Sequence, residues 1–216
     1  MKAPPEPGRV TRSQRSDEST PQLPFSDTQG NEAPYAGLRN RLAGPDPKRQ
    51  VWGCSKVWRL PADVETEQIA PASMPGCKLT MAARHCLETL RPEFATEVQP
   101  GDVIVAGANF GIGGSSEPAA AVLAHLGVAS VIAPSFAGQF FRDAFNAGLL
   151  LLTCPQAVLI DDGEMLEFDA RAARVQRTTP GLPLAVFECE PVAELLLELV
   201  EAGGLHAQLK KRRNKV

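Results

Sequence analysis

The feature that most constrains this chain is a strand-like apolar run joined to a helix-like segment by a glycine-rich turn. Residues 100–107, "PGDVIVAG", read as a turn and then a compact buried strand. The turn "NFGIGGSS" follows, and residues 117–127, "EPAAAVLAHLG", have the composition of a helix closed by Gly127. Gly107, Gly111, Gly113 and Gly114 permit positive φ and close backbone approach. The order strand, turn, helix predicts an α/β fold.

The same alternation continues on both sides of this unit. Short strands are predicted at 56–60, 128–134 and 149–154, and two strands with a turn at Asp162-Gly163 are predicted over 157–169. Helices are predicted at 81–90, at 138–149 ending at Gly148, and at 191–205. Two prolines in the acidic segment 61–74 disfavour a continuous helix there.

The glycine turn at the start of a helix has two interpretations. Ser115 or Ser116 is a good N-cap, and Pro118 is tolerated in the first turn of a helix. Free N–H groups and the helix dipole would favour a bound carboxylate or phosphate, but a capped turn can equally be structural. The segment is neither a P-loop nor a dinucleotide-binding fingerprint, because its glycine spacing fits neither.

Residues 1–50 differ from the rest of the chain. They are dense in Pro, Ser, Gln and charge, with few aliphatic residues, and we expect a disordered polar tail because they cannot bury enough apolar surface. A mitochondrial presequence is the alternative, although the acids from Glu6 to Glu32 are unusual in one. Residues 51–216 are predicted to form one folded domain.

Charge and hydropathy exclude some partners. The net charge of -3 gives no reason to expect a nucleic-acid partner, and the basic residues 210–216 are explained by a solvated helix end. No apolar run approaches the roughly 20 residues that span a bilayer. We therefore expect no membrane partner and a cytoplasmic protein, with the mitochondrial matrix as the other compartment.

The five cysteines are widely spaced and form no CxxC pair. An odd count without a secretory signal predicts reduced thiols, most of them small core residues. We expect no metal ligands and no iron–sulfur cluster in this chain alone. The residues are Cys54, Cys77, Cys86, Cys154 and Cys189.

Several separated motifs together resemble one family. The segments are "RPEFATEVQPGDVIVAGANFGIGGSSEPAA", "GVASVIAPSFAGQFFRDAFNAGL" and "EAGGLHAQL", and "ADVETEQIAPASM" is similar to a loop Asp-Thr-Asp-x-Ile-x-Pro-Ala. From about residue 56 to the C-terminus, the chain resembles the small subunit of 3-isopropylmalate dehydratase. That subunit is the swivelling domain of the aconitase superfamily.

The resemblance implies a swivelling β/β/α domain that closes over a large subunit carrying a [4Fe-4S] cluster. It implies a hydro-lyase or isomerase of the leucine-biosynthesis type, which removes water from a hydroxy di- or tricarboxylate and adds it back at the neighbouring carbon. On this basis Ser115 is the candidate catalytic base. The candidate substrate-binding residues are Asn109, Gly111, Gly113, Gly114, Ser116, Glu67 and Ser73.

Three family cations are absent. The family continues the glycine turn with Ser-Ser-Arg-Glu-His, and without gaps its base, arginine and histidine fall on Gly114, Ser116 and Pro118. Ser73 and Gly138 also stand where the family has arginines, and a serine cannot reproduce an arginine–carboxylate fork. Either the substrate carries fewer carboxylates, or the partner supplies the cation, or activity is lost.

Two hypotheses follow. The chain is a subunit of an active dehydratase, or it is a non-catalytic or substrate-divergent homologue with a role in assembly or regulation. Ser115 serves as base if the loop shifts by one residue. Arg142 is the first candidate for a replacement cation, and Asn109 either orients the turn or touches the substrate.

Overall fold

The computed structural model describes residues 51–71 and 79–213, which all belong to one compact unit, Glu32–Val216. The predicted tail (1–50), Ser73 and Cys77 lie outside the described residues.

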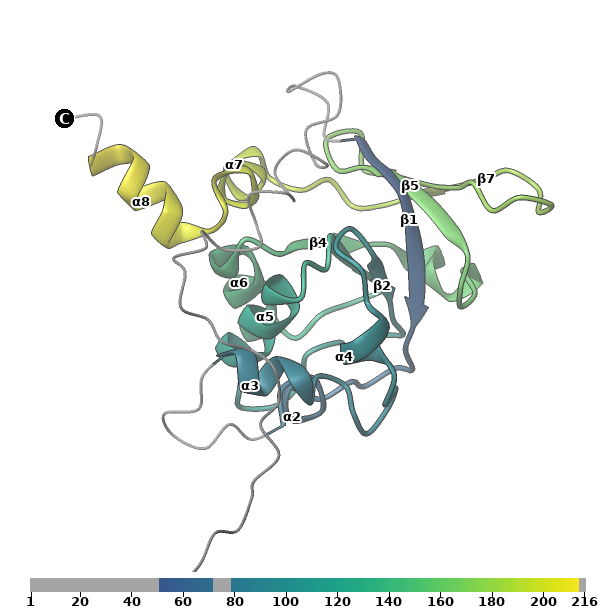
Figure 1. Cartoon of the computed structure of the whole chain (residues 1–216). Coiled ribbons are helices and arrows are strands. Elements are labelled where there is room, and N and C mark those ends of the chain that lie inside the picture. Colours follow the sequence, from purple (N-terminus) through teal and green to yellow (C-terminus); the bar gives the residue numbers. More distant parts are fainter. Residues whose placement is uncertain (1–50, 72–78, 214–216) are drawn as a thin grey trace, which may run out of the picture. The chain divides into compact units, whose positions relative to one another are not determined.

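A seven-stranded sheet with the order β4-β3-β2-β1-β5-β6-β7 forms the centre of this unit (Figure 1). β1 pairs in parallel with β2, which continues in parallel through β3 to β4. On its other side β1 pairs antiparallel with β5, and β6 and β7 extend that half. The strands are β1 (Val51–Arg59), β2 (Val103–Val105), β3 (Ser130–Ala133), β4 (Leu150–Thr153), β5 (Met165–Asp169), β6 (Arg174–Arg177) and β7 (Ala185–Glu188).

The sheet is curled, so that the ends of its two edge strands meet. The N–H of Glu190, just after β7, donates to the carbonyl of Thr153 at the end of β4 (2.8 Å). β1 takes part in both halves, and its pairing with β5 has an irregular register between Trp52 and Ser55, as at a β-bulge. Such irregularities bend a strand and increase its twist.

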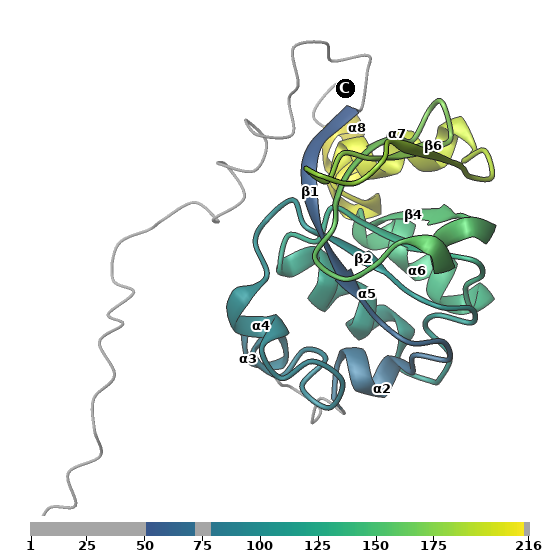
Figure 2. The same cartoon turned by 90° about the vertical axis from the view of Figure 1, so that its right-hand side faces the viewer.

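Helices cover the parallel half of the sheet. α5 and α6 each connect one parallel strand to the next and pack against each other on one face, with α2 and α3 beside α5. In Figure 2, α2, α3 and α4 lie at the opposite end from α7 and α8. The helices are α2 (Thr66–Ile69), α3 (Leu79–Arg84), α4 (Phe94–Glu97), α5 (Ser116–His125), α6 (Gly138–Ala147), the 3-10 helix η1 (Pro155–Leu159), α7 (Glu194–Ala202) and α8 (Leu205–Arg213).

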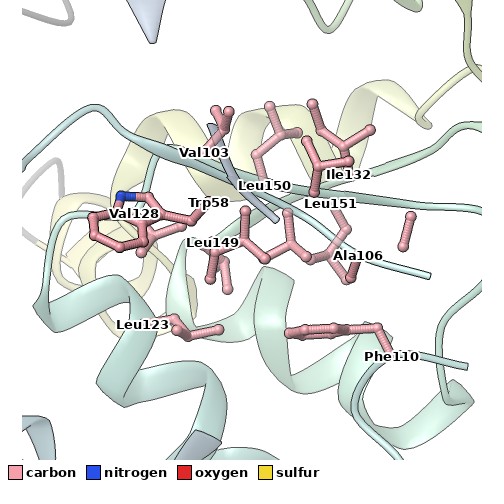
Figure 3. Packing of buried hydrophobic residues seen from close by; sticks show 14 of the residues in the cluster. Trp58, Val103, Ala106, Phe110, Leu123, Val128, Ile132, Leu149, Leu150 and Leu151 are labelled. Carbon is pink, nitrogen blue, oxygen red and sulfur yellow. The ribbon is translucent and has the colours of Figure 1, made fainter. Parts of the chain in front are cut away.

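The core fills the space between the parallel strands and these helices. Figure 3 shows Leu123 of α5 and Phe110 of the glycine turn facing the side chains of the central strands. Phe110 is fully buried, and its ring centroid lies 5.3 Å from that of Phe140 in α6. Trp58 of β1 packs edge-on against Phe94 of α4, with ring centroids 5.1 Å apart. The glycine turn is therefore attached to the core through its own aromatic side chain.

The predicted α/β fold is confirmed, including the central unit of β2, turn and α5. The helix before Gly148 ends as predicted, with Gly148 at φ 83°. Three element predictions were wrong. Residues 157–159, predicted as part of a strand, belong to the 3-10 helix η1. Residues 85–90 form turns beyond α3, and α8 follows α7 as a separate helix. The strands β6 and β7 were not predicted.

Four of the cysteines lie in the described part of the chain as free thiols. Cys86 and Cys154 are buried, as expected of small core residues. The expectation was wrong for Cys54, which is exposed, and Cys189 is partly buried. Within residues 51–71 and 79–213, every helix is too short or too polar to cross a membrane.

Candidate functional site

The candidate site lies at the carboxyl ends of β1, β2 and β3, where three loops are joined to one another. These loops are residues 60–65, 106–115 and 134–137. The joining backbone hydrogen bonds run from Asp63 N to Ala108 O (2.8 Å), Gly111 N to Val64 O (2.8 Å), Thr66 N to Ile112 O (2.7 Å) and Ala137 N to Phe110 O (2.9 Å). The crevice outside the carboxyl ends of parallel strands is where open α/β sheets bind ligands.

Two glycines of the turn serve different purposes. Gly111 is buried at φ 83°, and a β-carbon there would run into the ring of Phe140. Gly113 is exposed at φ 121°, and a β-carbon there would collide with the side chains of Thr66 and Glu67. Gly111 therefore allows close packing on α6, whereas Gly113 allows the loop to approach a carboxylate.

Glu67 lies at the centre of a small polar cluster at the start of α5. Its carboxylate accepts hydrogen bonds from the N–H of Gly114 (3.2 Å) and from the hydroxyl of Thr66 (2.9 Å). The Thr66 hydroxyl oxygen in turn accepts from the N–H of Ser115 (3.2 Å). The Ser115 side chain makes the smallest contribution to lowering the pKa of Glu67. The structure therefore brings Glu67, Gly113, Gly114 and Ser115 together.

These donors keep the Glu67 carboxylate charged. The hydrogen bond from Thr66 lowers the pKa of Glu67 most, followed by its own backbone N–H and that of Gly114; partial desolvation opposes the shift. Donors aimed at a carboxylate favour its ionised form. Two N–H groups at the start of α5 therefore have partners in this chain: that of Gly114 donates to the Glu67 carboxylate, and that of Ser115 donates to the Thr66 hydroxyl. Their binding of a substrate stays a prediction.

Ser116 points away from this cluster. It is 5% exposed, and its hydroxyl donates to Asp143 of α6 at 2.5 Å. Asp143 also accepts from the side-chain amide of Gln139 (2.9 Å), whose carbonyl accepts from Arg142 (2.6 Å). Arg142, the candidate replacement cation, is thereby engaged along the exposed side of α6. Ser115 is the N-cap residue of α5, but neither serine hydroxyl caps the helix.

Asn109 orients the turn. Its backbone has φ 59°, its side-chain amide donates to Asp63 (2.9 Å), and its N–H donates to the hydroxyl of Ser135 (2.9 Å). Asparagine tolerates this left-handed conformation better than most residues. Asn109 thus links all three loops of the site.

Sequence reasoning missed Thr66 and Asp143. Thr66 is the middle residue of "ETE", so the similarity of that segment to Asp-Thr-Asp was a usable signal for it. Asp143 had no comparable signal, because only the packing of α6 on α5 places it beside Ser116. Across residues 51–71 and 79–213, no group of three or more His, Cys, Asp or Glu could hold a metal ion. The described residues therefore offer no ligand set for an iron–sulfur cluster.

Several known proteins are similar to this chain in sequence and in fold. The aconitase C-terminal domain model matches residues 79–157. The methanogen homoaconitase small subunit of Methanothermobacter thermautotrophicus is 39% identical over 151 residues, 69% of this chain and 86% of its own. The 3-isopropylmalate dehydratase small subunit of Methanosarcina acetivorans is 37% identical over 161 residues, 72% of this chain and 95% of its own.

A solved structure agrees with these matches. The crystal structure of a 3-isopropylmalate dehydratase from Methanocaldococcus jannaschii superposes with a TM-score of 0.67 at 34% identity, and the match covers 74% of this chain and 94% of that one. The predicted small-subunit fold is thereby confirmed. This chain belongs to the family of 3-isopropylmalate dehydratase small subunits, within the aconitase superfamily.

Proposed function

We propose that this chain is the small subunit of an active hydro-lyase or isomerase that acts on a hydroxy dicarboxylic or monocarboxylic acid. Its partner would be a large subunit that carries a [4Fe-4S] cluster. The relatives are named dehydratase and homoaconitase small subunits, which supports a partner of this kind. The cluster supplies a Lewis acid when it is bound to that partner. The residues of this chain would orient the substrate and move a proton.

The observation that supports the proposal is the position of Ser115 beside Thr66 and Glu67. The Ser115 N–H donates to the Thr66 hydroxyl (3.2 Å), which itself donates to the Glu67 carboxylate (2.9 Å), and the Ser115 side chain contributes to lowering the pKa of Glu67. The neighbouring Gly113 and Gly114 are exposed, so the site can be approached from that side. In this proposal the Ser115 hydroxyl is the general base, with Glu67 as its proton acceptor.

The proton balance follows from this pair. As Ser115 Oγ accepts the proton from the substrate carbon, its own proton passes to the Glu67 carboxylate. The lowered pKa of Glu67 favours return of that proton when water is added back at the neighbouring carbon. Glu67 would thus serve as a proton relay. Its carboxylate occupies space that is left open because Gly113 has no side chain.

The residue that stands in place of the family arginine also bears on which substrate this chain can bind. Ser116 at that position is buried against Asp143, and Arg142 contacts Gln139. Neither side chain presents a cation to the Glu67 cluster. We therefore propose that the substrate carries fewer carboxylates on this side, or that the partner binds the second carboxylate.

The non-catalytic alternative is favoured by one observation. The donors at the start of α5 that could bind a substrate carboxylate are already engaged by Thr66 and Glu67. A chain that only assembles with or regulates a large subunit could retain this closed arrangement.

The test is turnover by the reconstituted pair with isopropylmalate, citrate, citramalate and a monocarboxylate analogue. We expect turnover of at least one of them, and we expect Ser115→Ala to lower kcat by roughly two orders of magnitude, as loss of a positioned base does. The matched control is Thr96→Ala, an exposed hydroxyl on α4. Complex formation and thermal unfolding are measured for every variant.

Each outcome has a distinct meaning. A pair that assembles and holds its cluster but turns over none of the four acids favours the non-catalytic alternative. Unchanged turnover in Ser115→Ala, with assembly intact, would place the base elsewhere. A cluster bound stoichiometrically by this chain alone would contradict the assignment of the cluster to the partner.

A further inference from the structure

Two thiols that are distant in sequence lie together where the curled sheet meets itself. Cys154 follows β4 at one edge of the sheet, and Cys189 follows β7 at the other. The backbone bond from Glu190 N to Thr153 O (2.8 Å) brings these two segments side by side. A second bond, from Cys189 N to Ala173 O (2.8 Å), fixes the backbone of Cys189.

The two cysteines lie beside each other. Glu188 and Glu190, the two chain neighbours of Cys189, contact the Cys154 thiol and the Thr153 carbonyl: the Cys154 thiol donates to Glu188 O (3.7 Å), and Glu190 N donates to Thr153 O (2.8 Å). Each thiol also shifts the pKa of the other. Cys154 is fully buried, whereas Cys189 is partly exposed. A reagent can therefore reach Cys189, while Cys154 lies in the interior beside it.

The surroundings of Cys154 favour its thiolate. The hydrogen bond from Cys189 lowers the pKa of Cys154 to about 7, and backbone N–H groups of Gln156 and Ala157 add to this effect against the opposing effect of burial. Those N–H groups belong to the first turn of η1, which begins directly after Cys154. Thiolates are stabilised at helix starts and beside a second thiol in the same way. The same hydrogen bond raises the pKa of Cys189.

From this arrangement we propose that Cys154 and Cys189 are a reversible dithiol–disulfide site, oxidised by small-molecule disulfides of the glutathione type. The Cys154 thiolate takes the proton of Cys189 as the Cys189 sulfur attacks the reagent disulfide. This step forms a mixed disulfide and releases one reagent thiolate. Cys154 then gives that proton to the released thiolate and attacks the Cys189 sulfur, which releases the second reagent thiolate; the second thiolate takes its proton from water. The products are one intramolecular disulfide and two reagent thiols.

The site is separate from the Glu67–Ser115 cluster, and the proposal does not depend on the function proposed above. The new bond would join the end of β4 to the end of β7, next to the Glu190–Thr153 hydrogen bond. It would therefore covalently close the curl of the sheet. Cross-links that close a loop of the chain constrain the unfolded state, so the oxidised form should melt at a higher temperature.

The experiment incubates the full chain with glutathione redox buffers at pH 8, blocks the remaining thiols and maps the tryptic peptides by mass spectrometry. Arg171, Arg174 and Arg177 separate the two cysteines into different peptides. We expect linked peptides that are lighter than the sum of the two thiol peptides by two hydrogens. The oxidation rate should fall as the pH is lowered through about 7, because the Cys154 thiolate is lost.

The other cysteines are internal controls. Cys54 is exposed and contacts the Thr178 hydroxyl (3.5 Å), so it should accumulate a glutathione adduct without forming the cross-link. Cys86 is buried, and burial raises its pKa, so it should remain unmodified. In urea all cysteines should react without preference for the 154–189 pair.

Single substitutions separate the role of Cys189, which reacts with the reagent first, from that of Cys154, which closes the disulfide. Cys154→Ala should trap a stable glutathione adduct on Cys189, because the second thiol is missing. Cys189→Ser should abolish the cross-link, and thermal unfolding confirms that both variants fold. A stable adduct on Cys189 in the unchanged chain would overturn the proposal, as would an unreacted pair under conditions that fully convert Cys54.

Discussion

At the scale of single residues, two adjacent serines have opposite surroundings. Ser115 is partly exposed and its N–H donates to Thr66, whereas Ser116 is buried and donates to Asp143. The difference follows from the geometry of a helix start, where successive side chains point in different directions. Of the two serines, the first is the one that solvent can reach.

Ser116 should therefore contribute to stability and not to substrate affinity. Ser116→Ala removes the hydroxyl that donates to Asp143, and we expect a loss of about 1 kcal/mol in the free energy of unfolding with KM unchanged. Ser116→Arg should pair with Asp143 and should not tighten substrate binding. Urea unfolding and kinetics of the reconstituted pair provide the measurements. A higher KM in Ser116→Ala at unchanged stability would show that Ser116 contacts the substrate.

Thr66 should control the ionisation of Glu67. Thr66→Val keeps the shape of a fully buried side chain but removes the hydroxyl that lowers the pKa of Glu67 most. The pKa of Glu67 should rise toward its ordinary value, as followed by carbon NMR of the carboxyl group during a pH titration. Thr96→Val, on the exposed side of α4, is the control.

The same substitution has a consequence for stability. A carboxyl group whose pKa is depressed on folding stabilises the protein above its unfolded pKa, about 4.3 for Glu, and loses this contribution as the pH falls through the folded value. Unfolding between pH 7 and pH 3 should therefore show a smaller acid-dependent loss in Thr66→Val. If both proteins lost the same unfolding free energy between pH 7 and pH 3, this role of Thr66 would be contradicted.

At the scale of elements, a buried ion pair fixes the antiparallel half of the sheet. Arg177 in β6 contacts Glu164, just before β5, at 2.7 Å, and these side chains are 16% and 5% exposed. Arg177 also donates to the carbonyl of Leu159 in η1 (2.7 Å). The pair thus attaches a short strand to the 3-10 helix that follows β4.

Removing one partner of this pair should be costly. Arg177→Met leaves the Glu164 carboxylate buried without its cation, and we expect a loss of about 3–5 kcal/mol in the free energy of unfolding. The matched control is Arg174→Met in the same strand, whose pair with Glu188 is 62% and 66% exposed and should cost at most about 1 kcal/mol. Urea unfolding measures both. Equal losses would mean that burial of the pair has no energetic consequence.

At the scale of the whole molecule, β1 is the strand that joins the two halves of the sheet. Its first residues pair with β5, with Val51 opposite Asp169 and Trp52 opposite Phe168, and its last residues pair with β2. Composition predicts a domain boundary after residue 50, and β1 is the first element of the described chain.

This boundary predicts two truncations with different outcomes. Removal of residues 1–50 should leave the melting temperature and the association with a large subunit unchanged, because that segment has too little apolar surface to form a core. Removal of residues 1–55 also deletes the first half of the β1–β5 ladder and should lower the melting temperature by several degrees. A large effect of the shorter deletion, measured by thermal unfolding or by pull-down, would show that residues 1–50 pack or dock.

The sequence by itself determined the central β2–turn–α5 unit, the end of α6 at Gly148 and the family. Each depends on local patterns, such as an apolar run, a left-handed glycine after a helix, or motifs in a fixed order. The short strands β6 and β7 escaped prediction because "RVQR" and "AVFE" show little alternation of apolar and polar residues. Their pairing partners and the Arg177–Glu164 contact are supplied by distant parts of the chain.

Only the tertiary structure decided how the candidate site is arranged. Composition suggested free N–H groups at the start of α5, but the loop after β1 delivers Thr66 and Glu67 to them. Packing of α6 on α5 places Asp143 beside Ser116, and the curl of the sheet brings Cys154 to Cys189. All of these contacts, including that of Cys154 with Cys189, join residues that are 27 to 49 positions apart in the sequence. Local propensity cannot specify them, because they form only when the sheet and its helices have assembled.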